Sequence, residues 1–275
     1  MPFEPCGIIT LTTDFGLVDP FVGIMKGRIL GRFPTARIVD LTHGIGPQAV
    51  EEAGFWLERS IGYFPAGTVH VAVVDPGVGT ARAVLAAPID GQLLLAPDNG
   101  LLAPLAARHT PEGIIRVELP RLERFGIRAL SATFHGRDLF APLAAELARG
   151  SCSPEELGDA AGVIVRAPLP VPRRSSEGIE GHVITVDHFG NLITDIEASE
   201  LASLAHPHVE LAELRLPLSR TYADVFPGEY LALVNSFGRL EIARAQSSAA
   251  AGLALGRGAA VRVRPAGEPI AGRRA

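Results

Sequence analysis

One stretch of the chain, residues 69–82, constrains the fold more than any other. It reads VHVAVVDPGVGTAR, an apolar run that passes directly into a charged, glycine-rich turn. Such a run is typical of a strand that is buried on both faces of a sheet. In open α/β sheets, ligands bind beyond the carboxyl ends of the strands. The pattern therefore predicts a strand over residues 69–74 that delivers Asp75 to such an edge, with Arg82 where the turn ends.

The first half of the chain repeats this alternation of apolar runs and helix-like segments. Asp90-Gly91 is a favoured hairpin dipeptide and predicts a tight turn between two of the strands. The alternation favours an α/β domain with a mostly parallel sheet and helices on both faces. The strands are predicted over residues 7–13, 36–41, 69–74, 84–87, 92–96 and 114–119.

The composition changes near residue 167. Residues 167–176 read APLPVPRRSS, and alternating prolines make a stiff, extended connector. After it, short strands separated by Gly and Pro turns favour a smaller β-barrel; one of them is predicted over residues 209–216. We therefore predict an N-terminal α/β domain over residues 1–166, a linker over 167–177 and a C-terminal β-barrel domain over 178–275.

Charge and cysteine content exclude several classes of protein. A formal net charge of −5 argues against a nucleic-acid binder, which would carry a basic stripe. Cys6 and Cys152 match no metal-binding spacing and predict no disulfide framework. No positively charged region precedes the first apolar run, and no run reaches the roughly 20 residues that span a bilayer. We expect a soluble cytoplasmic protein without nucleic-acid or membrane partners.

Asp75, Arg82 and His135 form the first candidate site. An Asp and a His beside one water molecule can orient it and accept its proton, while an Arg holds the carboxylate in place. The alternative is a structural ion pair between Asp75 and Arg82. His135, which precedes Gly136, could equally cap the helix that follows.

Asp14 is a candidate for binding a ribose, because a carboxylate can accept hydrogen bonds from both hydroxyls of the diol. The alternative is an Asx-turn at the end of the strand. Asp19 precedes Pro20 and could serve as a helix N-cap.

Residues 187–191, DHFGN, form a further candidate site. Phe189 and Tyr222 offer faces on which a flat heterocycle can stack. Asn191 can donate and accept together, as an adenine edge requires. The alternative is a β-turn in which Gly190 supplies a positive φ.

A metal site is a weaker hypothesis, since no helical His-x-x-x-His or other zinc spacing is present. We predict no metal and no cofactor. The side chains that could meet at one edge of the sheet are Asp14, His43, Asp75, His135 and Asp138.

Together, these motifs resemble those of one family, and they run along nearly the whole chain. The matching segments are TLTTDFG (10–16), DPFVGIMKG (19–27), DLTHGI (40–45), VVDPGVGTAR (73–82), APDNGLL (96–102), TFHGRDLFAP (133–142), VDHFGNLITDI (186–196) and NSFGRLEIA (235–243). On these segments the chain is similar to the S-adenosyl-L-methionine (SAM) hydroxide adenosyltransferases, also called SAM hydrolases, which are relatives of the fluorinase and chlorinase.

The resemblance implies an N-terminal α/β domain, a C-terminal β-barrel and a homotrimer. Each site would lie between the N-terminal domain of one subunit and the C-terminal domain of its neighbour. The implied reaction is attack of water or hydroxide at the ribose C5′ of SAM, which releases L-methionine and adenosine without a metal or organic cofactor.

The resemblance also implies a role for each candidate residue. The implied roles are water activation for Asp75, Arg82 and His135, the ribose diol for Asp14, the methionine ammonium for Asp19 and Asp187, the amino-acid end for Ser236, and adenine for Phe189, Asn191 and Tyr222.

Two positions separate hydrolases from halogenases in this family. Halogenases have a tyrosine where this chain has Asp75, and the fluorinase has a serine where this chain has Gly136. Phe237 stands where the fluorinase has an arginine at the amino-acid end, which leaves open what binds the methionine carboxylate. Two other functions stay open: a halide-dependent, chlorinase-like adenosyltransferase, and a sensor that binds adenosine or SAM with little turnover.

Overall fold

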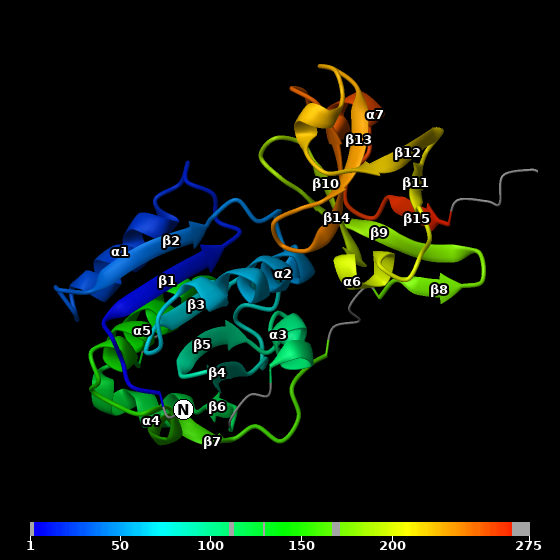
Figure 1. Cartoon of the computed structure of the whole chain (residues 1–275). Helices are drawn as coiled ribbons and strands as arrows, with labels where there is room; N and C mark the ends of the chain where they lie inside the picture. The colour runs from blue at the N-terminus through cyan, green and yellow to red at the C-terminus, as the bar shows by residue number, and fades with distance from the viewer. Residues whose placement is uncertain (1–2, 110–112, 129, 167–170, 266–275) are drawn as a thin grey trace, which may run out of the picture. The chain divides into compact units, whose positions relative to one another are not determined.

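The structure is a computed structural model that describes residues 3–109, 113–128, 130–166 and 171–265. The chain divides into Met1–Leu169 (unit 1) and Pro170–Ala275 (unit 2), and each unit is described by itself (Figure 1). The predicted domain boundaries stay predictions, and residues 167–170 of the predicted linker lie outside the described ranges. Another part of that linker, Arg173–Ser175, forms strand β8. No helix in the described ranges is long and apolar enough to cross a membrane.

Unit 1 is built on a seven-stranded sheet in the order β2-β1-β3-β5-β4-β6-β7. Strands β2, β1, β3 and β5 pair in parallel, whereas β4, β6 and β7 join by antiparallel pairings. The sheet is therefore mixed, because the hairpin at Asp90-Gly91 turns β4 back against β5. The strands are β1 (Ile8–Thr13), β2 (Arg37–Thr42), β3 (Val69–Val73), β4 (Val84–Ile89), β5 (Gln92–Pro97), β6 (Ile115–Val117) and β7 (Gly158–Ala160).

Helices cover both faces of this sheet (Figure 1). One apolar core lies between the sheet and helices α1 and α5, and a second lies between the sheet and helices α2 and α3. Strand β3 is buried along its whole length because it lies between these two cores. The helices are α1 (Phe21–Leu30), α2 (Val50–Ser60), α3 (Ala103–Arg108), α4 (Leu119–Leu122) and α5 (Ala141–Ala148).

Helix α2 shows how local sequence sets the packing. Glu51 and Glu52 in its first turn and Arg59 in its last turn complement the helix dipole. On the buried face, a Cβ atom at Gly54 would lie 2.5 Å from the carbonyl oxygen of Leu101. Only glycine permits this approach, so α2 packs directly on the backbone that leads into α3.

Unit 2 is a β-barrel (Figure 1). Its strands follow the order β10-β14-β13-β12-β11-β15-β9-β8, and the further pairing of β10 with β9 closes the ring. The pairing of β12 with β13 is parallel. The elements are β8 (Arg173–Ser175), β9 (Gly178–Val186), β10 (Leu192–Glu197), α6 (Ala198–Leu201), β11 (His208–Leu211), β12 (Leu214–Ser219), β13 (Tyr230–Val234), β14 (Arg239–Arg244), α7 (Ala249–Leu253) and β15 (Ala260–Arg264).

The predicted architecture, an α/β unit followed by a smaller β-barrel, is confirmed. One element differs, since residues 209–216 were predicted as a single strand and instead form the hairpin of β11 and β12. The turn is made at Ala212, whose φ is +51°. Glycine and asparagine are the usual residues at such a φ, so an alanine there carries no sequence signal for a turn.

Candidate active site

Strand β3 ends two residues before Asp75, and the turn that follows returns Arg82 to the same carboxylate. Arg82 Nε donates to Asp75 Oδ2 at 2.8 Å, and Arg82 Nη2 donates to the same oxygen. The two side chains are only 9% and 3% exposed. The Arg82 guanidinium also lies 5.8 Å from the centre of the buried Phe140 ring. These charge-assisted contacts fix the position of the carboxylate.

Gly79 brings the loop containing His135 against this turn. Its φ is +78°, and a Cβ atom there would lie only 2.1 Å from the carbonyl oxygen of Ala132. No other residue type fits at this contact. As a result, Arg82 Nη2 lies 2.8 Å from His135 Nδ1, although 53 residues separate the two in sequence.

His135 stands at the start of a π-helical turn, Gly136–Phe140, that continues into α5. The ring does not cap this helix; it contacts Arg82 instead. Burial, and then the charge of Arg82, lower the pKa of His135 against the opposing charge of Asp75. Because a guanidinium can only donate, Nδ1 is the acceptor and the proton of the neutral ring belongs on Nε2.

Asp138 holds the loop before this turn. Its Oδ2 accepts from the backbone N–H of Ser131 at 2.9 Å, and Arg137 donates to both of its oxygens. The hydrogen bond from Arg137 and the one from Ser131 hold the pKa of Asp138 well below its usual range. Asp138 therefore supports His135 through the backbone.

The second oxygen of Asp75 differs from the one that Arg82 contacts. Oδ1 is buried and has no hydrogen-bond partner within the described ranges. Beside it, a Cβ atom added at Gly77 would meet Oδ1 at 3.7 Å, an ordinary van der Waals distance. A carboxylate oxygen that has no partner keeps its capacity to accept a hydrogen bond, for example from a water molecule.

Asp14 lies at the same edge of the sheet. Strands β1 and β3 pair in parallel, with Thr13 opposite Val73, so Asp14 and Asp75 both follow neighbouring strand ends. Asp14 Oδ2 accepts from the backbone N–H of Gln48 at 2.9 Å, so the carboxylate contacts another loop and does not form the Asx-turn offered as the alternative. Asp19 is exposed and is not the N-cap of α1, which is Pro20.

In unit 2, the residues of the DHFGN segment contact one another. Asp187 Oδ1 accepts from the backbone N–H groups of Phe189 and Asn191, and Asp187 Oδ2 accepts from Asn191 Nδ2 at 2.9 Å. Gly190 has a φ of +84°, as the turn alternative requires. This turn leaves the Phe189 ring 75% exposed.

Glu241 was missed by the sequence reasoning. It is 2% exposed in β14, accepts from Tyr222 Oη at 2.7 Å and from Asn235 Nδ2 at 3.1 Å, and so links two candidate segments. Burial, with a contribution from the charge of Asp187, raises the pKa of Glu241. A lone acid between Leu240 and Ile242 was the available signal. Ser236, beside Asn235, is exposed.

The candidate residues thus fall into two groups, one in each unit. Unit 1 holds Asp14, Asp19, Asp75, Arg82 and His135, and unit 2 holds Asp187, Phe189, Asn191, Tyr222 and Ser236. In the described part of the chain, no three His, Cys, Asp or Glu side chains are placed to hold a metal ion.

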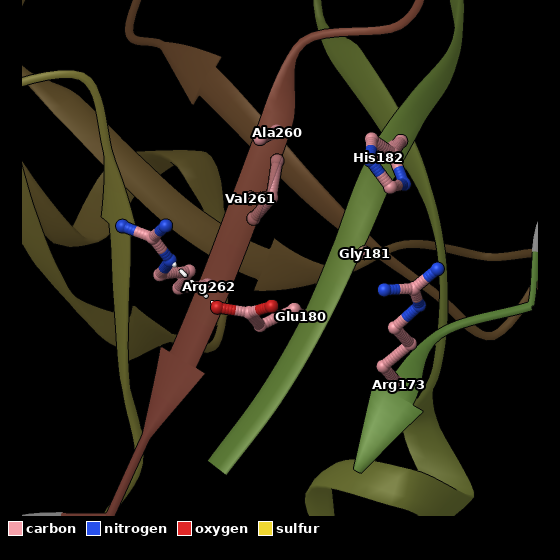
Figure 2. A pocket seen from close by; sticks show the side chains of 7 residues that line it. All are labelled: Arg173, Glu180, Gly181, His182, Ala260, Val261 and Arg262. Carbon is pink, nitrogen blue, oxygen red and sulfur yellow. Dashed lines mark hydrogen bonds and ion pairs between the residues drawn. The ribbon is translucent and has the colours of Figure 1, made fainter. Parts of the chain in front are cut away.

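A separate shallow pocket of about 220 Å³ lies on the barrel between β8, β9 and β15 (Figure 2). Figure 2 shows Glu180 facing Arg262, and their ion pair measures 2.9 Å. None of the candidate residues lines this pocket.

Comparison with known proteins extends over both units. The family model of the SAM hydroxide adenosyltransferase N-terminal domain matches residues 9–158, and that of the C-terminal domain matches residues 181–262. The chain is 41% identical to an (R)-S-adenosyl-L-methionine hydrolase from Salinispora tropica, over 87% of this chain and 90% of the relative. It is 40% identical to a protein of the same name from Thermus thermophilus, over 91% and 97%.

A more distant sequence relative and a solved structure are also similar to this chain over most of its length. A fluorinase from Actinoplanes sp. is 31% identical over 89% of this chain and 93% of its own length. A crystal structure of an uncharacterised conserved protein from Thermotoga maritima is 33% identical and superposes with a TM-score of 0.85, covering 93% of this chain and 99% of that one. With both domain models matched in order along the chain, this protein belongs to the SAM hydroxide adenosyltransferase family.

Proposed function

We propose that this protein is a SAM hydrolase in which Asp75 directs a water molecule at the ribose C5′ of SAM, releasing adenosine and L-methionine. The observation that carries the proposal is the cluster of Asp75, Arg82 and His135, in which one buried carboxylate oxygen has no hydrogen-bond partner among the described residues. The identity to relatives named (R)-S-adenosyl-L-methionine hydrolases supports the substrate.

The chemistry of SAM explains what such a site must supply. The sulfonium leaves as a neutral thioether, so the leaving group needs no proton and the scheme uses no metal or organic cofactor. The difficult step is to align a weak nucleophile and remove its proton. Asp75 Oδ1 is the free acceptor for that proton, whereas Nδ1 of His135 is already occupied by Arg82. In this scheme His135 and Arg82 align Asp75.

The remaining candidate residues are proposed to hold the substrate. Asp14 would bind the ribose hydroxyls, Asp19 and Asp187 the methionine ammonium, and Ser236 the amino-acid end. Phe189, Asn191 and Tyr222 would hold adenine. As the family resemblance implies, the proposal includes a homotrimer whose sites combine unit 1 of one subunit with unit 2 of a neighbour. Its proposed location is the cytoplasm, where Cys6 and Cys152 would stay reduced.

Product analysis tests the function. The protein is incubated with SAM in ¹⁸O-labelled water, with and without chloride. Hydrolysis predicts methionine and adenosine carrying ¹⁸O at the 5′ hydroxyl. Formation of 5′-chloro-5′-deoxyadenosine would identify a halide-dependent adenosyltransferase, and binding without product would identify a sensor. The variant Asp75→Asn should form little ¹⁸O-labelled adenosine if Asp75 directs the water. Its matched control is Asp159→Asn, which alters an exposed ion pair with Arg121 and should keep the activity.

A further inference from the structure

The DLTHGI motif has no role in the reaction proposed above, yet its histidine lies at the centre of a contact network. His43 is 5% exposed, and its two ring nitrogens face different partners. Nδ1 lies 2.8 Å from Thr13 Oγ1, and Nε2 lies 3.0 Å from Asp40 Oδ1, an electrostatic contact more than an aligned hydrogen bond.

The hydrogen bonds of Thr13 determine the direction of this network. Thr13 Oγ1 accepts from the backbone N–H of Phe15 at 3.3 Å, so its single hydrogen is directed to His43 Nδ1. The ring proton then belongs on Nε2, facing the carboxylate of Asp40. Burial opposes the charged form of Asp40, but its contacts with Lys26 and His43 outweigh this and lower its pKa. Lys26, the one lysine of the chain, lies 2.5 Å from Asp40 Oδ2.

Backbone N–H groups also connect the loop after β1, which contains Asp14, with the loop after β2, which contains His43. Gly16 donates its N–H to the carbonyl oxygen of His43 at 2.9 Å. Gln48 donates its N–H to Asp14 Oδ2 at 2.9 Å, and does so with a φ of +61°. A side-chain-bearing residue in this region is strained, and such strain persists only where surrounding contacts impose it. The loop after β2 therefore holds the loop after β1 by both its backbone and the His43 ring.

We infer that His43 is a positioning residue that sets the carboxylate of Asp14 for binding a ribose diol. This inference rests on the proposed function, in which Asp14 binds the ribose hydroxyls. A carboxylate has roughly four acceptor positions. Gln48 occupies one of them, and two further positions suffice for both hydroxyls, provided that the carboxylate is held in one orientation. His43 supplies that constraint through Thr13, the residue directly before Asp14.

A thermodynamic cycle tests the inference. Calorimetry measures the binding of adenosine and of 2′,3′-dideoxyadenosine to the full-length wild-type protein, His43→Ala and His43→Asn. The wild type is expected to prefer adenosine by more than about tenfold, because hydrogen bonds to a charged group are strong. His43→Ala is expected to lose most of this preference while binding the dideoxy compound as before. His43→Asn, whose Oδ1 replaces Nδ1 toward Thr13, should restore much of it.

Thr13→Val is a second, isosteric variant that removes the hydroxyl and should behave like His43→Ala. His109→Asn, in a histidine–aspartate pair on another surface of unit 1, is the control and should keep the full preference. If His43→Ala and Thr13→Val weaken both nucleosides by the same factor, the role of His43 is only structural and the inference is overturned. SAM hydrolysis by the wild type is measured separately, so the failure of the proposed function would be seen on its own.

Discussion

The two units hold their candidate residues in different ways. In unit 1, Asp75 and Arg82 are nearly buried and, with His135, make a set of contacts between segments far apart in sequence. In unit 2, Asp187 and Asn191 bond to each other within one turn, and the Phe189 ring is 75% exposed. If the proposed function holds, unit 1 has its reactive groups arranged in advance, as electrostatic catalysis requires. Under the same proposal, the exposed Phe189 ring of unit 2 serves recognition of the substrate.

The largest expected effect is a loss of turnover, without a loss of adenosine binding, when Asp75 of unit 1 is replaced. Asp75→Asn replaces the basic carboxylate by a neutral amide that cannot take the proton of water, and should lower kcat about 10²- to 10⁴-fold, the usual contribution of a general base. Binding of adenosine should change little, since no adenine-binding residue is altered. Single-turnover assays of adenosine release, with calorimetry for binding, measure both quantities. Hydrolysis at the wild-type rate would show that Asp75 is not the base.

A stability measurement tests what a buried histidine contributes to unit 1. His70 is 0% exposed and contacts Thr10 Oγ1 at 2.8 Å and Gln92 Oε1. Burial, only partly offset by the hydrogen bond with Gln92, lowers the pKa of His70 to about 4. The unfolded chain binds this proton near pH 6.5, so the stability is complete above that pH and is lost as the pH falls toward 4.

The loss expected from His70 is roughly 3 kcal/mol at the acid end of this range. Urea unfolding at pH 7.5 and pH 5, followed by the fluorescence of Trp56, reports on unit 1 because this one tryptophan lies in α2. His70→Gln should make the difference between the two pH values smaller. An unchanged difference would place the acid sensitivity elsewhere.

Gly136→Ser tests how tightly the π-helical turn is packed. An added Cβ would lie 3.1 Å from Met25 Sδ and 3.2 Å and 3.3 Å from ring carbons of Phe134 and Phe15. Overpacking of this kind costs about 1–3 kcal/mol, and the same change should also move His135. Gly23→Ser is the matched control, since nothing lies within 4 Å of its Cβ position. Equal melting temperatures for both variants would contradict this packing argument.

The smallest expected effect belongs to the open face of unit 2. Phe189→Ala should change the free energy of unfolding by less than about 0.5 kcal/mol, because the ring is exposed. It should weaken adenosine binding by about 1–3 kcal/mol if the ring stacks on the base. Phe226→Ala, whose ring is 77% exposed, is the control and should leave affinity unchanged. A loss of stability without a loss of affinity would show that Phe189 of unit 2 serves folding and not recognition of adenosine.

Much of the framework could be predicted because it depends on local patterns. Apolar runs of strand length end before Asp14 and Asp75, and parallel pairing then places both at one edge of the sheet. The hairpin at Asp90-Gly91 forms as the dipeptide predicts. In unit 2, the turn around Gly190 also follows from its own sequence. The β11–β12 hairpin could not be predicted, because Ala212 adopts a positive φ without any turn residue.

The sequence by itself determined which side chains stand at strand ends, because hydrophobic periodicity and turn residues act over a few neighbouring positions. Only the tertiary structure decided that Arg82 contacts both Asp75 and His135. The same holds for the hydrogen bond between His43 and Thr13 and for the one that Tyr222 donates to Glu241. Those contacts depend on the close approach of distant loops, such as Gly79 against Ala132. Such an approach is fixed by packing across the whole unit, and no local pattern encodes it.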